Sequence, residues 1–177
     1  MTDIQDATNT PTPQDWGEPR SKSVTWYDPM VTARTLTQLS GVQALQAIMD
    51  GTVAPPPIAA LFGYRITSVA NGEVTFSCTP DESAYNPIGV VHGGMVCTLL
   101  DTVLGCAVHS TLPAGVAYTS IELKVNYLRP VHDGKGDITA RGWVTKPGRR
   151  VAFADGEVRD RDGKLLATAT GSCLVMA

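Results

Sequence analysis

The sequence predicts an α+β fold in which antiparallel strands surround a single long central helix. Residues 93–109 are almost all apolar, which is typical of a helix that is buried on most of its sides. On both sides of this stretch, segments alternate apolar and polar residues with the period of two that half-buried strands show. Two strands before the helix and four after it favour an antiparallel sheet over alternating parallel units.

The expected strands are placed by their alternation. One of them alternates polar residues with four apolar side chains that we expect to face the core, namely Ile121, Leu123, Val125 and Tyr127. A first strand is expected soon after residue 58. The strand with these four side chains is expected at residues 120–127, and the remaining four at residues 73–78, 137–144, 151–158 and 165–175.

The chain divides into three parts. Residues 1–34 carry several prolines and no periodicity, so we expect a flexible N-terminal arm. Residues 35–57 hold a short amphipathic helix, which a capping box of Ser40 and Gln43 begins, and then a stiff connector rich in proline. Residues 58–177 form the main domain.

The composition excludes several classes of function. The chain has 177 residues, 43% of them hydrophobic and 18% charged, and a formal net charge of −3. Because nucleic-acid binding depends on positive charge, we expect no nucleic acid as a partner. No apolar run is long enough to cross a membrane, and the N-terminus lacks the pattern of a signal peptide. We therefore expect a cytoplasmic protein with no membrane partner.

The four cysteines do not form a metal-binding motif. They are scattered along the chain, and no two have the close spacing of zinc ligands. Each lies in an apolar segment, where a free cysteine packs like a small hydrophobic residue. We expect all four to be reduced and expect no metal site.

The central helix carries one carboxylate, that of Asp101. Charged side chains are almost never fully buried without a partner or a function. Asp101 is either a structural residue bonded to a neighbouring threonine or backbone group, or a functional carboxylate at a cleft. The second interpretation is favoured because the small and polar residues of this helix fall along one stripe: Gly94, Thr98, Asp101, Thr102, Gly105 and His109.

The Gly pair at the start of this helix is the second candidate feature. The first backbone N–H groups of a helix have no partner within it, and they can stabilise a developing negative charge. We expect the N–H of Gly93 to polarise an electrophile and His92 to orient the helix start. Eight residues of helix separate Gly93 from Asp101 by about 12 Å. The two groups can meet only if a two-fold axis pairs antiparallel copies of the helix, so we expect a homodimer with composite sites.

These residues form a motif with a known resemblance. The stretch Asn86-Pro87-x-Gly89-x-x-His92-Gly93-Gly94-(x)6-Asp101-Thr102 resembles the hotdog-fold acyl-CoA thioesterases of the phenylacetate-pathway (PaaI-like) type. The similarity runs from about residue 57 to residue 175. It includes Asn126-Tyr127-Leu128-Arg129-Pro130 in the strand after the helix and Gly148-Arg149-Arg150 in a later hairpin.

The resemblance implies a hotdog fold, a sheet wrapped around the helix, and assembly into dimers and often tetramers. It implies hydrolysis of an acyl-CoA thioester on which the Gly93 N–H polarises the carbonyl. Asp101 of the partner chain would activate water or attack the carbonyl itself. Asn86 and His92 would shape the loop around the carbonyl, and Thr102 would help to hold the water. No metal or redox cofactor is implied, and coenzyme A enters only as part of the substrate.

The phosphates of coenzyme A require cations. Arginine suits phosphate because its guanidinium group donates two parallel hydrogen bonds. Gly94 at the helix start is also expected to contact the substrate. The candidate cations are Arg129, Lys146, Arg149 and Arg150, and the alternative is a solvated basic hairpin.

Three other functions compete with hydrolysis. A hydratase of the same fold is disfavoured, because Ala84 occupies the position of that pattern's acid. A non-catalytic acyl-CoA binder would usually lack the carboxylate that Asp101 supplies, and a purely structural protein leaves the polar stripe unexplained. Aromatic and medium-chain acyl groups both remain open. We expect the depth of the acyl pocket to depend on Leu61, Phe62, Leu99 and Val103.

Overall fold

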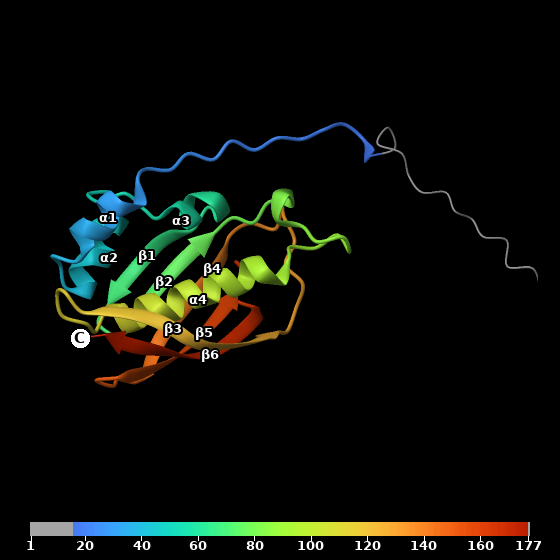
Figure 1. The fold of residues 1–177 in the computed structure, drawn as a ribbon. Helices are drawn as coiled ribbons and strands as arrows, with labels where there is room; N and C mark the ends of the chain where they lie inside the picture. The colour runs from blue at the N-terminus through green and yellow to red at the C-terminus, as the bar shows by residue number, and fades with distance from the viewer. Residues whose placement is uncertain (1–15, 177) are drawn as a thin grey trace, which may run out of the picture.

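The computed structural model describes residues 16–176 as one antiparallel sheet with a long helix across it, which confirms the predicted α+β class. The sheet has six strands in the order β1-β2-β4-β5-β6-β3, and every neighbouring pair is antiparallel. Helix α4 (Gly93–His109) lies against one face of the sheet (Figure 1). The strands are β1 (Arg65–Ala70), β2 (Glu73–Cys78), β3 (Ala117–Tyr127), β4 (Ile138–Lys146), β5 (Val151–Arg159) and β6 (Leu165–Met176).

Three shorter helices precede the sheet, and two of them differ from the sequence prediction. Helix α2 (Gly41–Met49) begins at the expected capping box. Helix α1 (Pro29–Leu36) extends into the segment predicted to be an arm. Helix α3 (Pro57–Phe62) follows the proline connector, where a strand was expected next. Among residues 16–176, no helix is long and apolar enough to cross a membrane.

A proline at the first helical position explains both differences. The side chain of Asp28 caps α1 by accepting a hydrogen bond from the N–H of Met30 at 2.8 Å, and Pro29 follows it. Pro57 takes the same first position in α3, which ends at Gly63 in the left-handed conformation. A proline there costs no hydrogen bond, because that N–H has no partner within a helix. The sequence analysis misses both helices because proline is also common in irregular segments.

Residues 16–28 form an extended segment that leads into α1, and residues 1–15 of the predicted arm lie outside the described residues. Three aromatic side chains of this part of the chain are exposed. Trp16 is 74% exposed, Trp26 59% and Tyr27 70%.

Helix α4 packs closely on the sheet because glycines lie beneath it. A Cβ atom at Gly142 would lie 2.4 Å from the carbonyl oxygen of Val103. A Cβ at Gly156 would lie 2.4 Å from a methyl group of Leu104. Gly142 and Gly156 are paired across β4 and β5, so together they provide a flat surface for the helix. This close packing leaves Leu99, Leu100 and Val103 fully buried.

A bulge in β3 changes which side chains face the helix. The pairing of β3 with β6 shifts between Ser120 and Glu122, so Ile121 is the extra residue. Before the bulge, the side chains of Tyr118 and Ser120 contact α4 residues; after it, Tyr127 does. The prediction that Ile121 faces the core is therefore wrong, and its side chain is 53% exposed.

Candidate active site

The polar stripe predicted for the central helix exists with one exception. Thr98, Asp101 and Thr102 are partly exposed along α4, and Gly94 is exposed at its start. Gly105 is buried, because a Cβ there would lie 3.2 Å from the ring of Tyr118. Because Thr98, Asp101 and Thr102 are only partly covered by the rest of the chain, a ligand can reach the helix along this stripe.

The carboxylate of Asp101 accepts a hydrogen bond from β3. The hydroxyl of Ser120 donates to Oδ1 of Asp101 at 2.7 Å. The hydroxyls of Thr98 and Thr102 donate instead to backbone oxygens one turn earlier, each at 2.8 Å. Neither threonine therefore holds the carboxylate. Within residues 16–176, no group donates to Oδ2 of Asp101, so this oxygen is available to a ligand or a water molecule.

The N-terminus of α4 offers one free donor. The ring of His92 caps the helix, since its Nδ1 accepts a hydrogen bond from the N–H of Gly94 at 2.8 Å. A Cβ at position 94 would lie 2.9 Å from that nitrogen, so a larger residue there would displace the capping ring of His92. Within the described part of the chain, nothing accepts a hydrogen bond from the N–H of Gly93. His92 is thus the N-cap residue of α4, and its ring leaves the N–H of Gly93 without a partner in the described part of the chain.

Tyr127 also fixes this helix start, although the sequence did not single it out for the site. Its hydroxyl donates to the carbonyl oxygen of Gly93 at 2.9 Å. Its ring packs on the same residue, where a Cβ would lie 3.1 Å from the ring. Burial, reinforced by Cys97, raises the pKa of Tyr127, so the phenol stays a neutral donor. The sequence signal for this contact was a tyrosine at the end of the strand after the helix, which could pack against the glycine pair at the helix start.

Gly93 lines a cleft of about 300 Å³. Asn86 lies on its wall. Its side-chain oxygen folds the loop between Asn86 and α4 by accepting hydrogen bonds from the N–H groups of Ile88 at 3.1 Å and Val90 at 3.3 Å. Gly93, Tyr127 and Arg129 line the same cleft. The structure thus brings Asn86, Gly93 and Arg129 together. Asp101 does not line this cleft, since eight helical residues separate it from Gly93 by about 12 Å.

The four candidate cations lie at two ends of the molecule. Arg129 is beside the cleft, where its guanidinium group donates to the carbonyl oxygen of Leu165 at 2.6 Å. Lys146 ends β4, near the C-terminus of α4, and its ammonium group lies 5.9 Å from the centre of the Phe153 ring. Arg149 and Arg150 follow it in the exposed β4–β5 turn. One chain therefore does not gather all four around one ligand.

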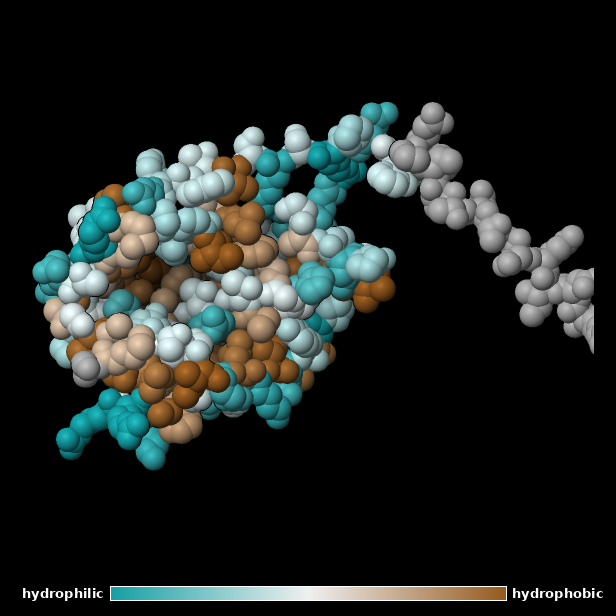
Figure 2. All heavy atoms as spheres, viewed as in Figure 1, coloured by the Kyte–Doolittle hydropathy of each residue, from teal (hydrophilic) through white to brown (hydrophobic). Residues whose placement is uncertain are grey.

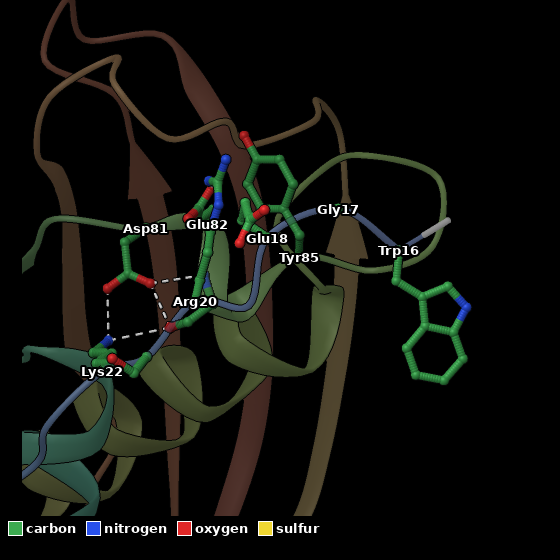
Figure 3. Close-up of a pocket in the computed structure, with 10 residues that line it drawn as sticks. Trp16, Gly17, Glu18, Arg20, Lys22, Asp81, Glu82 and Tyr85 are labelled. Atoms are coloured by element: carbon green, nitrogen blue, oxygen red, sulfur yellow. Dashed lines mark hydrogen bonds and ion pairs between the residues drawn. The ribbon is translucent and has the colours of Figure 1, made fainter. Parts of the chain in front are cut away.

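A larger hollow of about 820 Å³ lies between the N-terminal segment and the turn before Asn86. Figure 3 shows that ion pairs join its two walls, Arg20 with Glu82 and Lys22 with Asp81. The ammonium group of Lys22 lies 2.6 Å from the carboxylate of Asp81. Because both cations are already neutralised, this hollow is poorly suited to bind phosphate.

Metal ligands are not grouped in the part of the chain that the structure describes. No cluster of three or more histidine, cysteine, aspartate or glutamate side chains is placed to hold an ion in residues 16–176. All four cysteines are free, as expected. Burial raises the pKa of Cys106 to about 12, so its thiol is neutral at physiological pH.

Comparisons with known proteins identify the family. The family model of the thioesterase superfamily matches residues 88–167. Human acyl-coenzyme A thioesterase 13 is 31% identical over 130 residues, which cover 72% of this chain and 91% of that protein.

Two solved structures have a similar fold. A phenylacetic acid degradation-related protein from Ralstonia eutropha is 31% identical with a TM-score of 0.67, and the match covers 73% of this chain and 98% of that one. A thioesterase family protein from Silicibacter pomeroyi is 29% identical with a TM-score of 0.67, and covers 75% of this chain and 98% of that one. The motif, the fold and these matches agree, and the chain belongs to the thioesterase superfamily of hotdog-fold thioester hydrolases.

Proposed function

We propose that this thioester hydrolase cleaves acyl-coenzyme A, with Asp101 of one chain and the Gly93 N–H of a partner chain acting on the same thioester. One observation carries the proposal. A single helix presents a carboxylate with a free oxygen and, about 12 Å away, a free N–H. These are the base and the oxyanion donor that hydrolysis of an activated acyl group needs.

The proposed reaction uses each group in turn. The thioester carbonyl oxygen accepts a hydrogen bond from Gly93 N–H, where the helix N-terminus stabilises the charge that develops on it. Asp101 takes a proton from a water molecule as the water oxygen attacks the carbonyl carbon. The tetrahedral intermediate then expels the coenzyme A thiolate, which receives a proton, and the free acid leaves.

In the second route, the carboxylate of Asp101 attacks the carbonyl carbon directly. The thiolate leaves, and an acyl-aspartyl anhydride forms, which water then hydrolyses. Both routes use the same residues and give the same products. Ser120 holds Oδ1 of the carboxylate in either route, and the hydroxyl of Thr102 lies one position further along the helix.

A dimer through β3 would bring the two groups together. Strand β3 bonds to β6 on one side and is an edge of the sheet on the other within this chain. Its exposed side chains include Ile121 and Tyr127, at 53% and 54% exposure. An open edge with apolar side chains favours pairing with a second strand. Antiparallel pairing around a two-fold axis would place two copies of α4 side by side in opposite directions. A tetramer would join two such dimers.

The same arrangement would unite the cations. The C-terminal end of a partner's α4 would lie near the N-terminal end of this one. The turn that carries Lys146, Arg149 and Arg150 would then approach the cleft of Arg129 from the other chain. We place the phosphates of coenzyme A between them. Cytoplasmic location stays a prediction from the sequence.

The first test is release of free thiol from a panel of acyl-CoAs. We expect hydrolysis by the wild type, and loss of at least about 100-fold in kcat with Asp101→Asn, which keeps the shape of the side chain. The matched control is Asp162→Asn, at an exposed turn where the carboxylate lies 3.8 Å from Arg161. Equal activity of Asp101→Asn and wild type would refute the role of Asp101. Binding without hydrolysis across the panel would favour a non-catalytic acyl-CoA binder.

The composite site is tested by mixing two inactive variants. Gly93→Pro removes the proposed donor at the first helical position, where proline is tolerated and His92 already has the extended backbone that precedes proline well. Gly93→Ala is the control, because it adds the same Cβ and keeps the N–H. When Asp101→Asn and Gly93→Pro chains are co-expressed, half of the dimers are mixed and each mixed dimer holds one intact site. We expect about a quarter of wild-type activity to return. No recovery would refute the shared site.

A further inference from the structure

A second cavity adjoins the candidate carboxylate on the side away from β3. It has a volume of about 170 Å³ and lies between α2, the proline connector, α3, β1 and α4. Thr102 and Cys106 of α4 form one wall, so the cavity begins at the residue after Asp101 and continues one helical turn further. Figure 2 shows a hollow with an apolar floor in the same face, over the region where α2, β1 and α4 meet in Figure 1.

The polar groups at this cavity are already bonded within the protein. The hydroxyl of Thr102 donates to the backbone of Thr98 at 2.8 Å, and the buried hydroxyl of Tyr64 donates to the carbonyl oxygen of Met95 at 2.9 Å. The guanidinium group of Arg65 is paired with Asp137. The remaining wall is aliphatic, aromatic or neutral thiol, and includes Leu45, Ile48, Ile58, Ile66, Phe76 and Cys106. The side chains of Thr102, Tyr64 and Arg65 therefore offer no unpaired hydrogen-bonding group to a ligand inside this cavity.

The rim of the cavity is apolar as well. Met49 and Ile58 lie at it with 37% and 41% of their surfaces exposed. Large apolar side chains exposed together mark a site where an apolar partner enters. The rim therefore suits a chain that passes from solvent into the cavity.

We infer that this cavity receives the acyl tail of the thioester, and that the tail is uncharged, apolar and about the size of a benzene ring. The inference rests on the proposed function, since it places the thioester carbonyl at Asp101. A cavity of about 150 Å³ with an apolar lining holds one benzene molecule. Phenylacetyl and straight acyl chains of about six to eight carbons share this size, and longer chains exceed it.

The wall that sets the size belongs to the N-terminal part of the chain. Leu45, Ile48 and Met49 come from α2, and Pro55 and Pro56 from the connector. All five precede residues 88–167, which match the superfamily model. The part of the chain outside that match therefore determines which acyl group fits. This replaces the expectation from sequence, because Leu99 and Val103 are fully buried in the core and neither they nor Leu61 and Phe62 line the cavity.

The experiment measures kcat/KM for acyl-CoAs with two to sixteen carbons, for phenylacetyl-CoA, and for a tail that ends in a carboxylate. We expect a maximum at phenylacetyl or at six to eight carbons, with a gain of about three- to fourfold per methylene up to the maximum. The carboxylate-ended tail should be the poorest substrate of its length. Comparison of phenylacetyl with octanoyl tells an aromatic from a straight-chain substrate.

Variants of Ile48 locate the tail. Ile48→Ala should move the maximum of kcat/KM to longer acyl chains. Ile48→Phe should lower kcat/KM for acyl chains of six to eight carbons and leave it unchanged for chains of two to four carbons. The control is Leu61→Ala, on the neighbouring helix and 45% exposed, which should leave the profile unchanged. An unchanged profile in both folded Ile48 variants would overturn the inference.

Binding separates this inference from the proposed function. S-alkyl-CoA thioethers cannot be hydrolysed, so the change of their Kd with alkyl length reports the cavity independently of catalysis. A Kd minimum at six to eight carbons that moves in Ile48→Ala supports the cavity even if no thioester is cleaved. If hydrolysis depends on Asp101 but the Kd of the alkyl thioethers is the same in the Ile48 variants, the inference about the cavity is refuted and the proposed hydrolase function still stands.

Discussion

Ser120 donates a hydrogen bond of 2.7 Å to Asp101 from a strand that a bulge has turned. If β3 alternated regularly with no bulge, the face that presents Tyr127 to α4 would present Ile121 in place of Ser120. Bulges often re-aim a side chain beside a functional site. The bulge therefore supplies the partner of the carboxylate.

Loss of the Ser120 hydroxyl should lower catalysis more than stability. Ser120→Ala removes a hydrogen bond to a charged group, which is worth about 1.5–3 kcal/mol. We expect kcat to fall about 10- to 100-fold, with a Tm close to that of the wild type because the residue is exposed. Thiol-release kinetics and calorimetry check the two values. Ser68→Ala, at an exposed position of β1, is the control, and equal loss in both variants would contradict the role.

The hydroxyl of Tyr127 should matter through the position of Gly93. Tyr127→Phe keeps the ring against Gly93 and removes the 2.9 Å hydrogen bond to its carbonyl oxygen. We expect kcat to fall about three- to tenfold with little change in KM, because the donor acts mainly in the transition state. Tyr27→Phe, at a side chain that is 70% exposed, is the control. A change in KM alone would show that Tyr127 shapes binding instead.

Much of this structure could be predicted because the relevant signals are local. The period of the apolar residues gave α4 its observed bounds, and the capping box placed the start of α2. The stripe of α4 was correct except at Gly105, since a small residue can lie on an exposed face or beneath an aromatic ring. The ring of Tyr118 covers this glycine from β3, and no spacing within the helix reveals it.

The parts that were missed depend on contacts between distant segments. The bulge at Ile121 is decided by how β3 pairs with β6, which alternation in one strand does not encode. The acyl cavity needs α2 and β1 beside α4, although both precede that helix in the sequence and other segments lie between them. Arg129 and Arg149 both look like phosphate ligands, and only the sheet order shows that they lie at opposite ends of one chain.

Replacing a glycine where α4 packs on the sheet should cost stability according to what the added Cβ would meet. Gly142→Ala brings a Cβ to 2.4 Å from the backbone oxygen of Val103, which cannot move without the helix. We expect a loss of about 1–3 kcal/mol or more in the free energy of unfolding, or failure to fold. Gly105→Ala meets the ring of Tyr118 at 3.2 Å, a side chain that can shift, and it gains helix propensity.

Gly105→Ala should therefore be within about 1 kcal/mol of the wild type. Urea unfolding of both variants gives the comparison, with the m-value as a check that the same surface unfolds. Equal destabilisation by the two alanines would show that contact with the sheet is not what selects glycine at position 142.

The carboxylate of Asp137 should make stability depend on pH in the acid range. Hydrogen bonds from Thr79, Arg65 and Ser77 hold the pKa of Asp137 below its ordinary value. A carboxylate with a lowered pKa stabilises the fold above its unfolded pKa of about 3.9, and this contribution is lost as the pH falls through the lower folded value. Asp137→Asn should thus be less stable than the wild type at pH 7, and the difference should shrink from about pH 5 to pH 2. Thr79→Val removes the largest of the three contributions and should show the same trend more weakly. Unfolding curves at a series of pH values test this, and parallel stability profiles for wild type and Asp137→Asn would show that the carboxylate is bonded equally in the unfolded chain.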